Sequence, residues 1–155
     1  MVRLCEGQSK KTLTRWSLRY AAERLLPIYE KEFPGDTRLR ESMEAAFRWF
    51  VGEIKLPAAK RVILEAHAAA REAEGHDAAQ AAARAIAQAA STIHAATHCI
   101  GIVYYGTAAV AYDEVGGESL FYADIYEREC ARMAEMLRSM RVEDEENPAE
   151  LNWNS

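Results

Sequence analysis

Apolar residues recur every three or four positions along most of this chain, which is the spacing of amphipathic helices. The first such segment covers about residues 14–32, and one face of it carries four apolar residues: Leu18, Ala22, Leu25 and Tyr29. Pro27 lies inside this segment. Because proline removes a backbone donor from a helix, we expect a kink or a break near Glu23–Leu26.

Further helical segments follow the first one. Their approximate ranges are residues 37–51, 57–74, 78–113 and 118–141, with a break at Gly116-Gly117 between the last two. The segment 78–113 is long enough for a helix of about 50 Å at 1.5 Å per residue. One continuous or gently bent helix is our preferred interpretation, and a break near Ser91-Thr92 or at Gly101 is the alternative.

Alanine dominates the stretch between Pro57 and Tyr112. It is the strongest helix former, and its small side chain lets neighbouring helices approach closely. No segment shows a convincing strand pattern. The sequence therefore predicts an all-α, single-domain bundle of about five helices with Ala-rich helices at its centre. The bundle covers residues 14–141, between an N-terminal arm (1–13) and an acidic, mobile tail (142–155) in which Leu151 and Trp153 could dock.

Charge is distributed unevenly along the 155 residues, whose net charge is −5. Residues 1–57 carry +3, residues 58–112 are neutral and residues 113–155 carry −8. An acidic end argues against nucleic-acid binding, which depends on neutralising phosphates, and it suits a basic protein partner. No uncharged apolar run resembles a membrane span, because polar residues interrupt the nearest candidate, Ala87–Tyr112.

The three cysteines, Cys5, Cys99 and Cys130, have neither a pairing pattern nor metal-ligand spacing. The first residues contain no apolar core of a secretory signal. Both features are typical of a reduced, cytoplasmic protein in which Cys99 and Cys130 are small core residues.

Three histidines could form a metal site. His94 and His98 are four residues apart, which would place both on one face of a helix, and His67 on the preceding helix could supply a third ligand. Three histidines with open coordination positions suit zinc, nickel or ferrous iron. No carboxylate shares their face, so the favoured interpretation is that they form hydrogen bonds within a tight alanine core.

Five tyrosines gather in the fourth and fifth segments: Tyr104, Tyr105, Tyr112, Tyr122 and Tyr126. Core packing with each hydroxyl at the edge is the favoured interpretation. A partner surface is the alternative, because tyrosine is frequent among interface hot spots. The chain contains no nucleophile motif and no phosphate-binding loop, so an interaction protein is favoured over an enzyme.

Three short motifs connect the chain to a known family. They are a CAERVLP-like helix (here Ala21–Pro27), a P-x-D-x-R-x-R turn (Pro34, Asp36, Arg38, Arg40) and a W-x-x-G-E-I helix end (Trp49, Gly52, Glu53, Ile54). The alanine-rich stretch adds His67 and an H-x-x-x-H-x-x-G pattern (His94, His98, Gly101). With these motifs, residues 16–112 resemble a family of bacterial immunity proteins, the immunity-five-like domains of polymorphic toxin systems. The chain departs from the family's pattern at Ser42-Met43 and Phe47, and its fifth helix and tail have no assigned place there.

The resemblance implies a non-enzymatic protein that binds and neutralises a cognate toxin. It carries no catalytic residues over to this chain. The alternative is a metal-binding helical bundle or hydrolase that uses His67, His94 and His98 around a divalent metal. A homodimer is also expected, because a long apolar fourth segment would be hard to cover within one copy.

Overall fold

The computed structural model describes residues 1–116 and 120–153, and over these ranges the chain is helical with no β-strand. The elements are α1 (Val2–Cys5), α2 (Lys10–Tyr20), the π-helix η1 (Ala21–Leu25), α3 (Leu26–Glu32), α4 (Arg38–Phe50), α5 (Leu56–Glu72), α6 (Asp77–Ser91), the 3₁₀-helix η2 (Ala96–Ile100), the π-helix η3 (Ile102–Gly106), α7 (Thr107–Val115) and α8 (Tyr122–Met140). The all-α prediction is confirmed. The expected count of about five helices is too low, because the first and fourth predicted segments are each divided.

The first division lies where Pro27 predicted a kink. The π-helix η1 joins α2 to α3, and the Leu26 amide donates back to the Ala21 carbonyl. Pro27 has no amide proton, so it stands at the start of α3, where helices leave their first donors unpaired. The widened turn absorbs the missing bond without ending the helical path.

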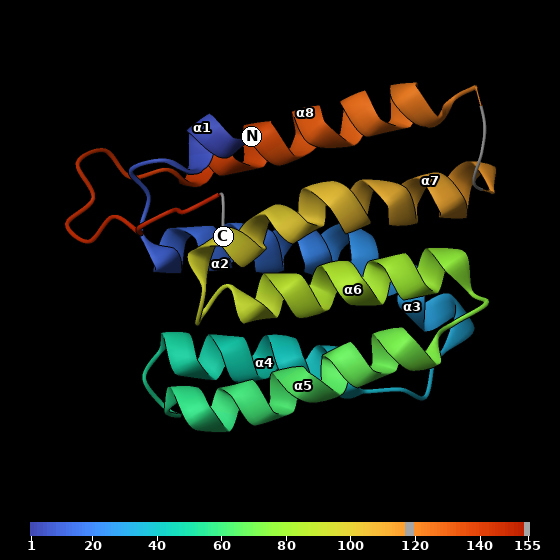
Figure 1. The fold of residues 1–155 in the computed structure, drawn as a ribbon, viewed down its shortest axis with the longest axis horizontal. Helices are drawn as coiled ribbons and strands as arrows, with labels where there is room; N and C mark the ends of the chain where they lie inside the picture. The colour runs from blue at the N-terminus through green and yellow to red at the C-terminus, as the bar shows by residue number, and fades with distance from the viewer. Residues whose placement is uncertain (117–119, 154–155) are drawn as a thin grey trace.

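The preferred interpretation of residues 78–113 as one helix is wrong. Helix α6 ends at Ser91, and the chain reverses so that α7 runs back alongside α6 (Figure 1). The Thr92 hydroxyl donates to the Gln88 carbonyl, while the Thr92 amide turns to the Ala89 carbonyl at 3.3 Å. A side chain therefore takes the acceptor that a continuing helix needs. The alternative break near Ser91-Thr92 is the correct one.

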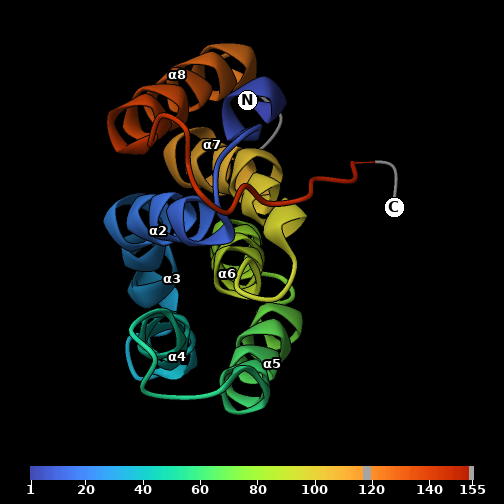
Figure 2. The same ribbon diagram turned by 90° about the vertical axis from the view of Figure 1, so that its left-hand side faces the viewer.

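Helix α6 is the central element of the bundle. It packs against α2, α3, α4, α5 and α7, as the end-on view shows (Figure 2). Its alanines are buried on almost every side, so five neighbours can approach one helix. The close fit continues at Gly101, where an added Cβ would lie 2.4 Å from Gln88 Cβ. The Ala-rich helix α6 therefore occupies the centre as predicted, whereas the Ala-rich helix α5 lies at the edge of the bundle, in contact with α4 and α6.

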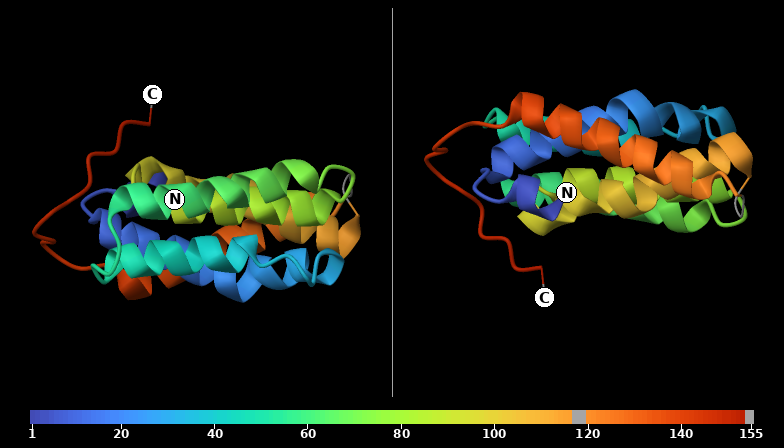
Figure 3. Two further views of the ribbon diagram at one scale, coloured as in Figure 1. Left: turned by 90° about the horizontal axis from the view of Figure 1, so that it is seen from below. Right: turned by 90° about the horizontal axis from the view of Figure 1, so that it is seen from above.

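The other helices lie close to their predicted ranges. Helices α4 and α5 form an antiparallel pair on one side of α6 (Figure 3). Helix α2 begins at Lys10, within the predicted arm, rather than near Thr14. Gly116 ends α7 with a left-handed φ of 74°, which favours glycine. Gly117 and the predicted start of the fifth helix at Glu118 lie outside the described residues.

The first part of the acidic tail lies on the N-terminus of α2. Glu145 accepts hydrogen bonds from the Ser9 amide at 2.6 Å, from the Ser9 hydroxyl and from the Thr12 hydroxyl at 2.8 Å. A carboxylate is favourable there because unpaired amides and the helix dipole make this end positive. Leu151 and Trp153 pack against the core, as predicted. Mobility of the tail stays a prediction.

No helix in the described ranges has both the length and the apolar composition needed to cross a bilayer. Homodimerisation also stays a prediction, but its original reason is gone. The fourth segment folds back on itself, and one copy of the chain buries most of it.

Candidate functional site

The five tyrosines are solvent-exposed, so the prediction that they pack in the core is wrong. Tyr104 is 64% exposed and Tyr126 is 39% exposed. The other three are exposed to nearly the same degree as Tyr126: Tyr105, Tyr112 and Tyr122. All five lie on η3, on α7, into which η3 leads, and on the first turns of α8, which runs alongside α7 (Figure 1). Leu120 and Phe121 at the start of α8 are exposed as well. We call these seven residues the tyrosine surface.

Tyr126 is central to this surface. It lies on α8 one helical turn before Cys130 and one turn after Tyr122. The contact with Cys130 and the neighbouring tyrosines raise the pKa of Tyr126. Tyrosines of η3 and α8 are therefore close enough to affect one another's ionisation. Tyrosine suits such a surface because it combines a large apolar ring with a hydrogen-bonding hydroxyl.

Helix α8 also carries an ion-pair network around a buried carboxylate. Glu129 is fully buried and accepts hydrogen bonds from the Tyr20 hydroxyl at 2.7 Å and from Arg24 at 2.9 and 3.2 Å. Arg128 lies at 3.1 Å and Arg132 at 3.6 Å. Burial raises the pKa of Glu129, but the Arg24 and Tyr20 hydrogen bonds outweigh it, and the net pKa is lowered. This network ties α8 to α2 and η1.

Glu129 was not among the residues predicted from the sequence. Its position in the sequence could have indicated a buried carboxylate, because it shares the apolar stripe of α8 with Ile125, Met133 and Met136. A carboxylate on such a stripe requires paired cations. The sequence does not show which cations those are, since Arg24 is more than a hundred residues away.

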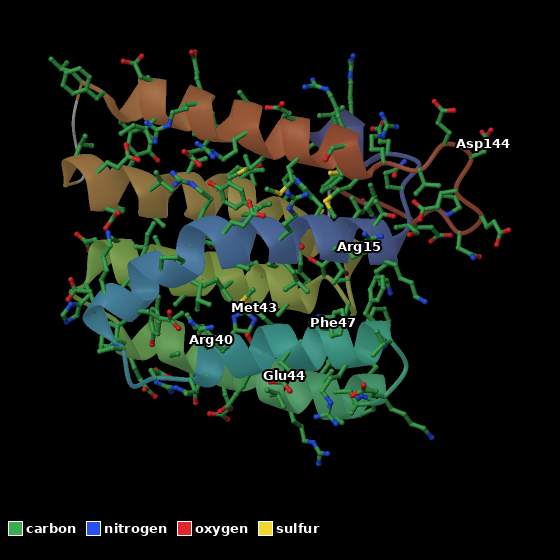
Figure 4. The ribbon with its side chains drawn as sticks, turned by 180° about the vertical axis from the view of Figure 1, so that it is seen from behind. Arg15, Arg40, Met43, Glu44, Phe47 and Asp144 are labelled. Atoms are coloured by element: carbon green, nitrogen blue, oxygen red, sulfur yellow. The ribbon has the colours of Figure 1, made fainter. Side chains whose placement is uncertain are left out.

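A second exposed apolar group lies on α4, at the far side of the bundle from α8. Phe47 is 58% exposed and stacks on Phe50 at 6.5 Å between ring centroids. Seen from behind, Phe47 on α4 and Arg15 on α2 border the space between these helices (Figure 4). A cavity of about 250 Å³ lies there. This group is smaller than the tyrosine surface and carries no tyrosine.

The structure brings His67, His94 and His98 into one neighbourhood. The rings of His94 and His98 are 5.1 Å apart, although His94 lies in a turn and His98 in η2 rather than on one α-helix. His67 Nε2 is 3.1 Å from the Ser91 hydroxyl, and His98 Nδ1 hydrogen-bonds with the Gln88 side chain. These bonds match the favoured interpretation of histidines within an alanine core.

Metal binding by these histidines stays a prediction. His94 Nδ1 is buried without a hydrogen-bond partner. Nevertheless, the described parts of the chain contain no group of three histidine, cysteine, aspartate or glutamate residues placed to hold a metal ion. The cysteines form no disulfide, and Cys99 is buried while Cys130 is partly exposed.

Comparison with known protein families shows to which family this chain belongs. The sequence model described as "Imm-5 like putative immunity protein" matches residues 3–136. The chain belongs to this family. No curated protein and no solved structure matches the chain.

The match to the Imm-5 like family extends beyond the resemblance seen in the sequence, which ended near residue 112. It includes α7 and α8 as far as Met136, so the fifth predicted segment has a place in the family after all. The whole tyrosine surface and the Glu129 network lie inside the matched region. The acidic tail lies beyond it.

The histidines of this Imm-5 like protein predict how its stability depends on pH. Burial, and for His67 and His94 also nearby positive charge, lowers the pKa of all three from the ordinary 6.5. Below about pH 6.5 the unfolded chain therefore binds more protons than the folded protein, so the free energy of unfolding increases with pH in this range. We expect stability to fall as the pH drops from about 6.5 to about 5.

Urea unfolding at a series of pH values measures this effect. The variant His94→Gln/His98→Gln is expected to flatten the dependence above about pH 5, where carboxylates contribute little. His76→Gln changes an exposed histidine outside the cluster and serves as the control. An unchanged pH dependence in the double variant would show that these histidines are not its source.

Proposed function

We propose that this protein binds a cognate toxin and neutralises it by covering part of the toxin's surface, without catalysing a reaction. Family membership supports the class of function. The tyrosine surface is the observation that carries the proposal, because monomeric proteins seldom expose so many large aromatic side chains on neighbouring helices without a partner for them.

The helices beneath the tyrosine surface suit a role as a preformed binding site. Tyr122 and Tyr126 lie one turn apart on α8, and the buried Glu129 network holds that helix against α2. A side chain on a fixed helix loses little conformational freedom on binding, so more of its contact energy is available for affinity. The tyrosines of this surface therefore need little rearrangement when the toxin binds.

Co-expression tests the proposal. The toxin-domain protein encoded beside this chain's gene is expected to arrest growth when produced alone and to be harmless when produced with this protein. The two purified proteins are expected to form a stable complex in size-exclusion chromatography. Growth arrest that this protein does not relieve, together with separate elution, would contradict the proposal. A cytoplasmic location stays a prediction.

A further inference from the structure

The cavity between α2 and α4 combines an apolar lining with polar groups along one helix. Its volume is about 250 Å³. The apolar side chains come from three helices: Leu18 of α2, Phe47 and Phe50 of α4, and Met140 at the end of α8. The other lining residues all belong to α2: Thr14, Arg15 and Arg19. An apolar cavity with a few placed polar groups is the usual character of a small-molecule site.

Thr14 brings an unused hydrogen-bonding group to this cavity. The residue is fully buried, and its hydroxyl has no hydrogen-bond partner within residues 1–116 and 120–153. The next buried hydroxyl along α2, that of Ser17, donates to the Thr14 carbonyl at 3.1 Å. Buried polar groups nearly always have a partner, because leaving one unpaired lowers stability. A bound molecule with an oxygen atom would supply the partner that the Thr14 hydroxyl lacks.

The charges around the cavity favour an anionic ligand. Helix α2 carries lysines and arginines but no carboxylate, and no described aspartate or glutamate lines the cavity. Arg19 pairs with Glu23 at 2.9 Å, whereas Arg15 is exposed and has no ion pair in the described parts of the chain. Lys11 Nζ lies 5.4 Å from the centroid of the Phe50 ring. Because a guanidinium can hold a carboxylate through two parallel hydrogen bonds, Arg15 suits that group.

The volume of the cavity limits the size of the ligand. Sites for drug-sized molecules measure about 300–1,000 Å³, and a cavity of about 150 Å³ holds benzene. A cavity of about 250 Å³ therefore accommodates one ring, or a short aliphatic chain, with a short polar arm. Nucleotides and peptide segments are too large for it.

We propose that this cavity binds a small free carboxylic acid whose apolar body is one ring or a short chain. The ligand's carboxylate pairs with Arg15, and its apolar body packs against Leu18 and Phe47. One of its oxygens accepts a hydrogen bond from the Thr14 hydroxyl. No residue of the tyrosine surface lines the cavity, so this site is separate from the toxin-binding surface and goes beyond the proposed function.

Titration of the full chain with 3-phenylpropionate tests the inference. Shifts of backbone amide signals in NMR spectra report both the affinity and the location of the ligand. For a ligand of this size we expect a dissociation constant of about 0.1–1 mM, with the shifts confined to α2, α4 and the end of α8. The uncharged 3-phenylpropanamide has nearly the same shape and should bind at least about 10-fold more weakly.

Variants of the lining residues test each contact separately. Arg15→Gln and Phe47→Ala should each weaken binding about 10-fold, and Thr14→Val about 5-fold. Thr14→Val should not lower the urea midpoint of the free protein, because the hydroxyl that it removes has no partner there. Arg61→Gln and Leu64→Ala are the matched controls, since they change exposed residues of α5 outside the cavity and should retain the parent affinity.

Three results would overturn the inference. The first is the absence of saturable shifts up to about 10 mM acid, which is well above the expected dissociation constant. The second is equal affinity for the acid and the amide, or for the parent and the variants Arg15→Gln and Thr14→Val. The third is tighter binding of the peptide acetyl-Gly-Gly-Phe than of the free acid, because the site would then hold the end of a polypeptide chain. Each of these results leaves the proposed function standing.

Discussion

Replacing Glu129 with alanine is expected to lower the free energy of unfolding by about 3–5 kcal/mol, because it leaves buried partners without their acceptor. The Tyr20 hydroxyl and the Arg24 guanidinium both lose hydrogen bonds to a carboxylate that is fully buried. Arg24 and Arg128 would then repel each other with only Glu114 between them. Urea denaturation of the parent and the variant measures the difference.

Glu114→Gln is the control for this prediction. Its carboxylate pairs with Arg128 at 2.7 Å but is 38% exposed, and exposed ion pairs contribute about 1 kcal/mol or less. A Glu129→Ala variant within about 1 kcal/mol of the parent would mean that the network is not a main source of stability. Glu129→Gln keeps an acceptor and should fall between the two.

Removing two central tyrosines is expected to weaken toxin binding by a factor of roughly 10³, at about 2 kcal/mol for each hot-spot residue. The variant is Tyr104→Ala/Tyr126→Ala. Both side chains are exposed in the free protein, so its unfolding free energy should change little. Calorimetric titration of the toxin domain measures the loss, and unfolding of the free variant checks that the fold is intact.

Phe47→Ala is the matched control, since it removes an aromatic ring that is 58% exposed on α4. The affinity of this variant should equal that of the parent. A larger loss for Phe47→Ala than for the tyrosine pair would move the binding site to the space between α2 and α4.

The sequence predicted the helices well because helix formation depends on local properties. The alanine-rich stretch, the kink before Pro27 and the apolar stripe of α8 can each be read within a few turns. The turn after Ser91 was the less favoured alternative, because alanine propensity on both sides favours a continuous helix. The Thr92 hydroxyl takes the Gln88 carbonyl and ends α6, a side-chain bond that helix propensity does not display.

The exposure of the tyrosines was missed for a related reason. Tyr104 and Tyr105 lie in an uncharged stretch, which indicates burial by composition. They belong to the π-helix η3. Its turn is wider than that of an α-helix, so its residues lie at other angles around the helix axis than α-helical spacing predicts. Helical spacing alone therefore assigns these tyrosines to the wrong side. Glu129 was missed because its partners come from distant helices.

Footprinting of the complex tests the central claim most directly. Hydroxyl-radical labelling reports how accessible each aromatic side chain is in the free protein and in the complex with the toxin domain. We predict that labelling of Tyr104, Tyr122 and Tyr126 slows when the toxin binds, while labelling of Phe47 stays the same. Protection of Phe47 with the three tyrosines labelled as fast as in the free protein would contradict the assignment of the tyrosine surface as the toxin-binding site.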